Sequence, residues 1–108
     1  MKETFGEYIR KLRTENKLTL TQLAAKLDLD SANLSKIENG KREFDEKRLE
    51  KLATTFKLDL AILKAEFYSD FIAKKLYETN CNNEVFVLAE KKIEYLKQKN
   101  LTQSKFNF

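Results

Sequence analysis

Residue types that support catalysis are scarce in this sequence of 108 residues. There is no histidine and only one cysteine, Cys81, which excludes Ser-His-Asp and Cys-His catalytic sets, an intrachain disulfide and a zinc site. Two glycines cannot build a phosphate-binding loop or a dinucleotide fingerprint. The acidic residues Glu43, Asp45 and Glu46 suit helix capping and the helix dipole better than acid–base catalysis. We therefore expect no enzyme, no cofactor and no metal site.

A short polar face offers a different chemistry, which is contact with the edges of DNA bases. Leu34 and Ile37 have the spacing of anchors on one side of a short helix, and small or polar residues occupy the other side. Such a surface can enter a major groove, where a lysine at Lys36 favours guanine through O6 and N7. The free face consists of Ser31, Ala32, Asn33, Ser35 and Lys36.

Two short helices joined by a tight turn are predicted to position this face. The first runs over residues 21–27, with Thr19 or Leu20 at its start. Asp30 follows the turn and is a strong N-cap candidate for a second helix over residues 31–38. Gly40 supplies the left-handed residue that ends it. This pattern is typical of a DNA-binding helix-turn-helix.

Apolar periodicity predicts helices through the rest of the chain as well. Thr4 and Glu7 have the spacing of a capping box for the first helix. No proline and only two glycines argue against an all-β domain, so we predict an all-α fold. Residues 41–44 are expected to form an exposed loop. The other predicted helices cover residues 4–16, 46–56, a segment starting near 60, 67–78 and 84–99.

Several short motifs are specific as a set. They are Ile9-Arg10, Leu12-Arg13, Leu23-Ala24, Ser35-Lys36-Ile37-Glu38, Gly40-Lys41-Arg42, Leu49 and Leu52-Ala53. With these motifs, residues 5–64 resemble the xenobiotic-response-element family of helix-turn-helix regulators. That family includes the lambdoid phage repressors and the controller proteins of restriction–modification systems.

The resemblance implies a five-helix lambda-repressor-like DNA-binding domain over residues 1–66, acting as a two-fold dimer on double-stranded DNA. It implies a structural ion pair between Arg13 and Glu38. Gly6 stands where the family often has glycine, which suggests close packing. The positions that carry base contacts in the family are Ser31, Ala32, Asn33 and Lys36. The positions that carry phosphate contacts are Thr19, Thr21, Ser35, Asn39, Lys41 and Arg42.

Three residues depart from the family pattern. Leu20 replaces a glutamine that buttresses the recognition helix and reaches a phosphate, and leucine does neither. Asp28 replaces the turn glycine, so it is expected to take a left-handed conformation. Phe44 replaces a common proline, and we expect this to affect only the rigidity of the loop.

Residues 67–99 exceed what the family domain needs and are predicted to form a C-terminal helical hairpin, with residues 100–108 as a disordered tail. The aromatic stripe on the helix over residues 67–78 is too rich to remain in water. One interpretation is that it closes the core of the monomer, and the one we favour is a dimer interface. The interface residues would be Phe67, Phe71, Ile72, Leu76, Phe86 and Ile93.

The charge pattern limits how DNA would be held. The net charge is +4, but residues 1–45 hold nine basic and eight acidic groups. DNA binding therefore depends on a few placed cations, with a modest dependence on salt. The N-terminus lacks the apolar core of a signal peptide, and no stretch approaches about 18 apolar residues, so a cytoplasmic protein without membrane contact is expected.

The function predicted from these features is an autoregulated repressor or controller that binds a palindromic operator as a homodimer. An antitoxin-type module, whose C-terminal helices bind a partner protein, is the alternative. A scaffold that keeps the fold without binding DNA is a third possibility.

Overall fold

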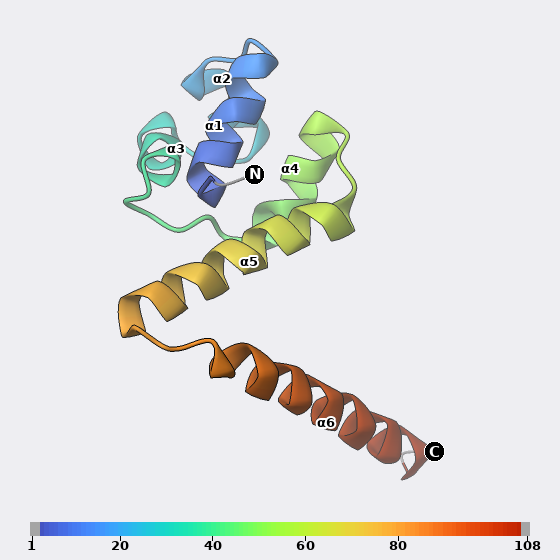
Figure 1. Cartoon of the computed structure of the whole chain (residues 1–108). Coiled ribbons are helices and arrows are strands. Elements are labelled where there is room, and N and C mark those ends of the chain that lie inside the picture. Colours follow the sequence, from blue (N-terminus) through green and yellow to red (C-terminus); the bar gives the residue numbers. More distant parts are fainter. Residues whose placement is uncertain (1–2, 107–108) are drawn as a thin grey trace. The chain divides into compact units, whose positions relative to one another are not determined.

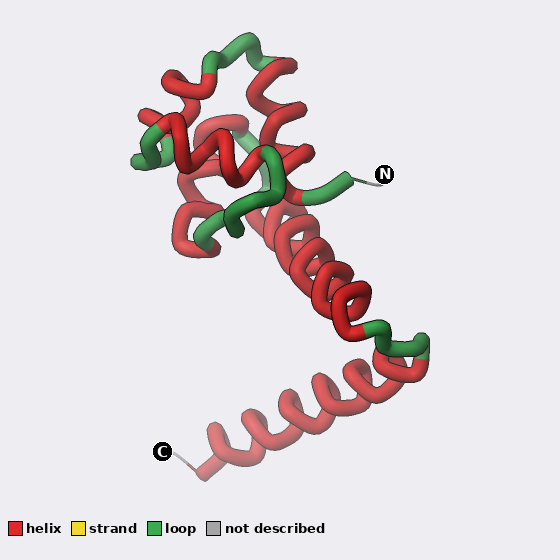
Figure 2. Tube along the Cα trace, turned by 90° about the vertical axis from the view of Figure 1, so that its left-hand side faces the viewer, coloured by secondary structure: helices red, strands yellow, loops and turns green. Residues whose placement is uncertain are grey.

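A computed structural model of the chain describes residues 3–106, with side chains described as far as residue 100. These residues form helices and the turns between them, as predicted for an all-α fold (Figures 1 and 2). The elements are α1 (Phe5–Glu15), α2 (Leu20–Lys26), α3 (Ser31–Glu38), a 3₁₀ helix η1 (Glu46–Arg48), α4 (Leu49–Phe56), α5 (Leu60–Thr79) and α6 (Glu84–Phe106).

The first three helices begin at capping residues that are visible in the sequence. The Thr4 hydroxyl accepts from the Glu7 N–H, and the Glu7 carboxylate accepts in return from the Thr4 N–H, which confirms the predicted capping box. Thr19 and Gln22 form a second such box at α2. Asp30 caps α3, as predicted. These caps satisfy N–H groups that a helix start leaves without partners.

The last two helices are longer than their periodicity predicted. The segment starting near residue 60 and the helix over 67–78 are one continuous helix, α5. Helix α6 continues to Phe106, beyond the predicted end at Lys99, and residues 107–108 lie outside the described residues. Neither helix contains glycine or proline, so nothing in the backbone chemistry interrupts them.

The hydrophobic core lies among α1 to α4 and the start of α5. Its largest side chains without solvent exposure are Ile9, Leu23, Leu27, Leu34, Leu52 and Leu63. Gly6 allows α1 to approach α3, because a Cβ at this position would lie 2.2 Å from the Ile37 carbonyl oxygen. The predicted close packing at Gly6 is thus confirmed.

Phe44 belongs to this core, and its predicted place in an exposed loop is wrong. Its side chain is 5% exposed, and its ring centroid lies 5.6 Å from that of Phe5. Phe5 also meets Phe67 of α5 edge-to-face at 5.2 Å. Phe44 therefore fixes the loop onto the core by aromatic burial and does more than change the loop's rigidity.

The chain divides into two compact units, and the boundary falls after Ala73, within α5. The first unit contains the core described above. The second contains the end of α5, a turn at Asn80 and α6. No described helix combines the length and the apolar character needed to span a lipid bilayer.

Candidate nucleic-acid interface

Helices α2 and α3 and the turn between them form a helix-turn-helix. Asp28 has a φ of 56°, so the predicted left-handed turn residue is confirmed. The Leu29 N–H donates to the Ala24 carbonyl at 2.8 Å, which closes the turn. Ala24 is buried where α2 packs against α3. The turn chemistry and the small residue together fix the direction in which α3 leaves the core.

Helix α3 is anchored on one side and free on the other. Leu34 and Ile37 are buried, while Ser31, Ala32 and Lys36 are exposed. The remaining two residues of the predicted free face, Asn33 and Ser35, are half-buried. The structure thus exposes three of the five predicted residues and leaves the other two partly covered.

A chain of hydrogen bonds crosses this free face. Arg42 Nη1 donates to Asn33 Oδ1 at 2.7 Å, and Asn33 Nδ2 donates to Asp30 Oδ2 at 3.0 Å. Arg42, which the family resemblance assigns to a phosphate, therefore contacts the recognition helix itself. Sequence reasoning missed this contact because nine residues and a loop separate the two side chains.

The buried carboxylate of Glu38 joins the end of α3 to α1. Arg13 Nε donates to Glu38 Oε2 at 2.7 Å and its Nη2 donates to Oε1 at 3.0 Å, which confirms the predicted ion pair. These bonds raise the pKa of the Arg13 guanidinium above its ordinary value. Arg10 also binds Glu38, at 3.3 Å, and reaches Asn39 Oδ1 at 2.9 Å.

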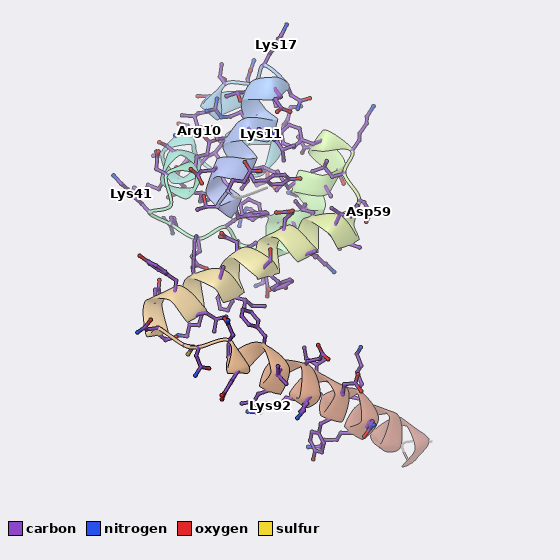
Figure 3. The ribbon with its side chains drawn as sticks, viewed as in Figure 1. Arg10, Lys11, Lys17, Lys41, Asp59 and Lys92 are labelled. Carbon is purple, nitrogen blue, oxygen red and sulfur yellow. The ribbon has the colours of Figure 1, made fainter. Side chains whose placement is uncertain are left out.

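The other residues assigned to phosphate contacts occupy different settings. Thr19 and Thr21 are exposed at the start of α2, where Thr19 is the N-cap. Asn39 donates through Nδ2 to the Ser35 carbonyl at 2.9 Å, which satisfies part of the end of α3. Lys41 projects from the loop after α3 and is exposed (Figure 3).

The residues predicted for a dimer interface differ in how far they are exposed. Phe67 packs against the core of its own chain, so the interpretation that the stripe closes the monomer core holds for this residue. Leu76 is half-buried. The others leave about half of their surface exposed, and they are Phe71, Ile72, Phe86 and Ile93.

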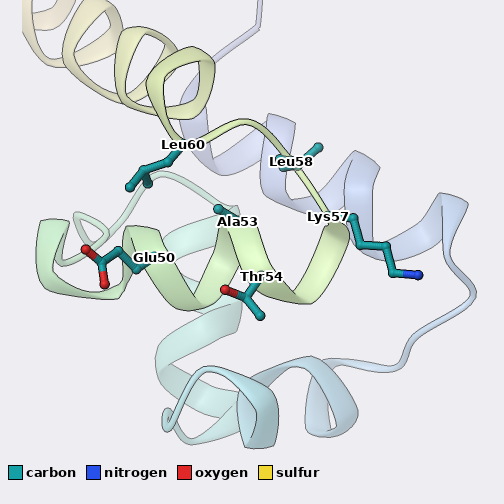
Figure 4. Close-up of a pocket in the computed structure, with 6 residues that line it drawn as sticks. All are labelled: Glu50, Ala53, Thr54, Lys57, Leu58 and Leu60. Carbon is teal, nitrogen blue, oxygen red and sulfur yellow. The ribbon is translucent and has the colours of Figure 1, made fainter.

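The structure also contains a pocket that is lined by residues outside α3. An open pocket of about 470 Å³ lies between α4 and the start of α5 (Figure 4). Its charged lining residues, Glu50 and Lys57, point away from each other. Among residues 3–100, no group of histidine, cysteine, aspartate or glutamate side chains is arranged to hold a metal ion.

A helical core that presents α3 through a tight turn defines the helix-turn-helix class of proteins. The helix-turn-helix family matches this chain over residues 9–63, which is 55 of its 108 residues, and the chain belongs to that family. The resemblance to the xenobiotic-response-element regulators is thereby confirmed.

Two relatives and one solved structure show which helix-turn-helix proteins this chain is similar to. The HTH-type transcriptional repressor RghR of Bacillus subtilis (strain 168) is 41% identical over 83 residues, which cover 73% of this chain and 62% of RghR. The chain thus spans less than two thirds of that repressor. Control protein C.MunI of a Mycoplasma species is 39% identical over 71 residues, covering 65% of this chain and 90% of C.MunI.

The solved structure is a SinR protein/SinI protein complex. One of its chains superposes with a TM-score of 0.50 at 19% identity, covering 90% of this chain and 98% of that chain. At this identity the likeness concerns the fold. The named relatives are a repressor and a control protein, in agreement with the prediction of a regulator rather than an enzyme.

Proposed function

We propose that this protein is a sequence-specific DNA-binding transcriptional regulator, an autoregulated repressor or controller that acts as a homodimer on a palindromic operator. The observation that carries the proposal is the free face of α3, whose polar residues stand outward from buried Leu34 and Ile37. The names of RghR and C.MunI, a transcriptional repressor and a control protein, support it.

In this proposal α3 lies in the major groove and α2 lies across the DNA backbone. Lys36 is exposed and reaches guanine O6 and N7, the acceptors that a lysine fits. Base contacts would come from Ser31, Ala32, Asn33 and Lys36. Phosphate contacts would come from Thr19, Thr21, Ser35, Asn39, Lys41 and Arg42.

The homodimer is supported by apolar surface in the second unit. Phe86 and Ile93 of α6 are 55% and 52% exposed, and Leu96 is 54% exposed. Side chains of this kind gain about 25 cal/mol for each Å² removed from water, and a second copy offers the same surface in return. Two recognition helices would then contact half-sites about 34 Å apart.

Selection of bound sequences from a random pool of double-stranded DNA tests the proposal. We expect one palindromic sequence with two half-sites. On that sequence, Lys36→Ala should weaken binding by about 1–3 kcal/mol and relax the preference at one base pair of each half-site. A protein that enriches no sequence, or a Lys36→Ala variant with unchanged affinity and selectivity, contradicts it.

Two lysines serve as controls for Lys36. Lys64→Ala removes the same charge from an exposed position on α5 and should leave both affinity and selectivity unchanged. Lys41→Ala should weaken binding to all sequences alike and reduce the salt dependence, as expected for a phosphate contact. A stable complex with a small toxin-like protein and no DNA selection would favour the antitoxin alternative.

A further inference from the structure

We propose that Asn33 reads an adenine in each half-site and that Asp30 and Arg42 are positioning residues that set its amide for this base. The inference rests on the proposed DNA-binding function and adds the identity of one base and the residues that select it. It also moves Arg42 from phosphate binding to the control of specificity.

The amide of Asn33 is held from both ends. Arg42 Nη1 donates to its Oδ1 at 2.7 Å, and its Nδ2 donates to Asp30 Oδ2 at 3.0 Å. A guanidinium only donates and an ionised carboxylate only accepts. Rotating the amide by half a turn would bring NH₂ against the guanidinium and oxygen against the carboxylate, so one orientation is fixed.

The orientation of the Asp30 carboxylate is fixed because Asp30 also caps α3. Its Oδ1 accepts the Asn33 backbone N–H at 2.7 Å as the cap of α3, so Oδ2 is left facing the Asn33 side chain. Bonds in which one partner is charged are shorter and stronger than neutral ones. The helix cap, the amide and the guanidinium therefore form one arrangement on the free face.

The bonds leave Asn33 one acceptor site on Oδ1 and one N–H on Nδ2. Adenine presents an acceptor at N7 and a donor at N6 in the major groove, which this pair matches. Guanine presents acceptors at both N7 and O6, so the Asn33 oxygen would face another acceptor. Asn33 is half-buried beside exposed Ala32, which leaves the amide open on the side of α3 proposed to face DNA.

The test measures the Kd of the full chain for the selected operator with each of the four bases placed in turn at every half-site position. We expect the wild type to prefer adenine at one position by about tenfold or more. Asn33→Ala should abolish that preference and leave the preferences at other positions intact. The preference is the ratio of the Kd values of one protein sample for two bases at the same position. It therefore does not depend on the fraction of the protein that is folded.

Variants of the two positioning residues show whether these residues affect the choice of base or only the overall affinity for DNA. Arg42→Ala and Asp30→Asn should each lower the preference for adenine over guanine at that position, which is the Kd for guanine divided by the Kd for adenine. Asp30→Asn keeps an oxygen that can cap α3 but can turn a donor toward Asn33. Lys41→Ala, the neighbouring cation, should lower affinity for all four bases equally and leave the ratio unchanged.

The outcomes distinguish the inference from the function on which it rests. If the wild type selects no sequence, the proposed function fails. If the wild type selects an operator but Asn33→Ala keeps every base preference, the adenine assignment is overturned. If Arg42→Ala weakens all four bases by the same factor, Arg42 binds phosphate and its positioning role is overturned.

Discussion

The core of the first unit and helix α6 of the second treat their apolar side chains in opposite ways. In the first, six large aliphatic side chains have no exposed surface, and the rings of Phe44 and Phe67 each meet that of Phe5. In the second, Phe86, Ile93 and Leu96 are each more than half exposed. The same helical periodicity thus produces a closed core in one unit and an open stripe in the other.

This difference indicates which contacts stabilise each unit. The core of the first unit is closed by residues of that unit, and the only buried charged residue among those described, Glu38, has two arginine partners. Its stability should therefore be independent of protein concentration. In the second unit the described side chains of α6 after Val85 are exposed, so this helix gains stability mainly when another surface covers it. This supports placing DNA recognition on the core of the first unit and association on the exposed apolar residues of α5 and α6.

The largest expected effect follows from removing the buried carboxylate of the first unit. Glu38→Ala leaves Arg13, whose side chain is 15% exposed, without its partner, and should lower the free energy of unfolding by about 3–5 kcal/mol. The matched variant Glu94→Ala on α6 removes an exposed carboxylate and should change stability by less than about 0.5 kcal/mol. Urea unfolding followed by circular dichroism measures both.

Glu38→Gln serves as a second control, because it keeps the shape and one acceptor oxygen and should cost less than Glu38→Ala. Equal costs at Glu38 and Glu94 would show that the Arg13–Glu38 contact contributes nothing to the first unit.

A pair of leucines compares the two apolar environments directly. Leu52 has no exposed surface, and Leu52→Ala should cost about 2–5 kcal/mol at any protein concentration. Leu96→Ala, at a leucine that is 54% exposed, should cost little in dilute protein but should shift the monomer–dimer equilibrium toward monomer. Unfolding in urea and light scattering over a concentration series separate the two effects. If Leu96→Ala left the mass unchanged at every concentration, α6 would not be the dimer surface.

The features that the sequence alone could predict are mostly those of the core in the first unit. The buried faces of α1 to α4 follow from apolar residues spaced at helical intervals, and the caps at Thr4 and Asp30 follow from residue type and a spacing of three. Asp28 in the turn was predictable because aspartate tolerates the left-handed region. These are local properties, so a single sequence contains them.

What the sequence could not provide were contacts between side chains distant along the chain. Phe44 lies alone among charged residues, so no periodicity marked it as buried. Arg10 and Arg42 look like ordinary surface cations, and only the folded backbone brings Arg10 to Glu38 and Arg42 to Asn33. Phe67 shares a stripe with exposed Phe71, and the geometry of α5 alone decides that one packs inward.

The smallest expected effect concerns the residues that end one helix in each unit with a positive φ. Lys57, at 55°, ends α4 in the first unit, and Asn80, at 55°, follows α5 in the second. A side chain with a Cβ is strained in this region by about 1–2 kcal/mol, although asparagine is strained less than lysine. Glycine removes the strain but makes the unfolded chain more flexible, which offsets part of the gain.

Lys57→Gly should therefore raise the free energy of unfolding of the first unit by about 0.5–1 kcal/mol. The Lys57 side chain extends away from its neighbours, so little packing is lost with it (Figure 4). Asn80→Gly should gain less in stability. Its gain belongs to a turn within the second unit, so the unfolding transition of the first unit should not move. Thermal unfolding of the two variants at one concentration makes the comparison, with Lys57→Ala as the control that removes the side chain and keeps the strain. A Lys57→Ala variant as stable as Lys57→Gly would show that the lysine side chain, and not the backbone, carries the cost.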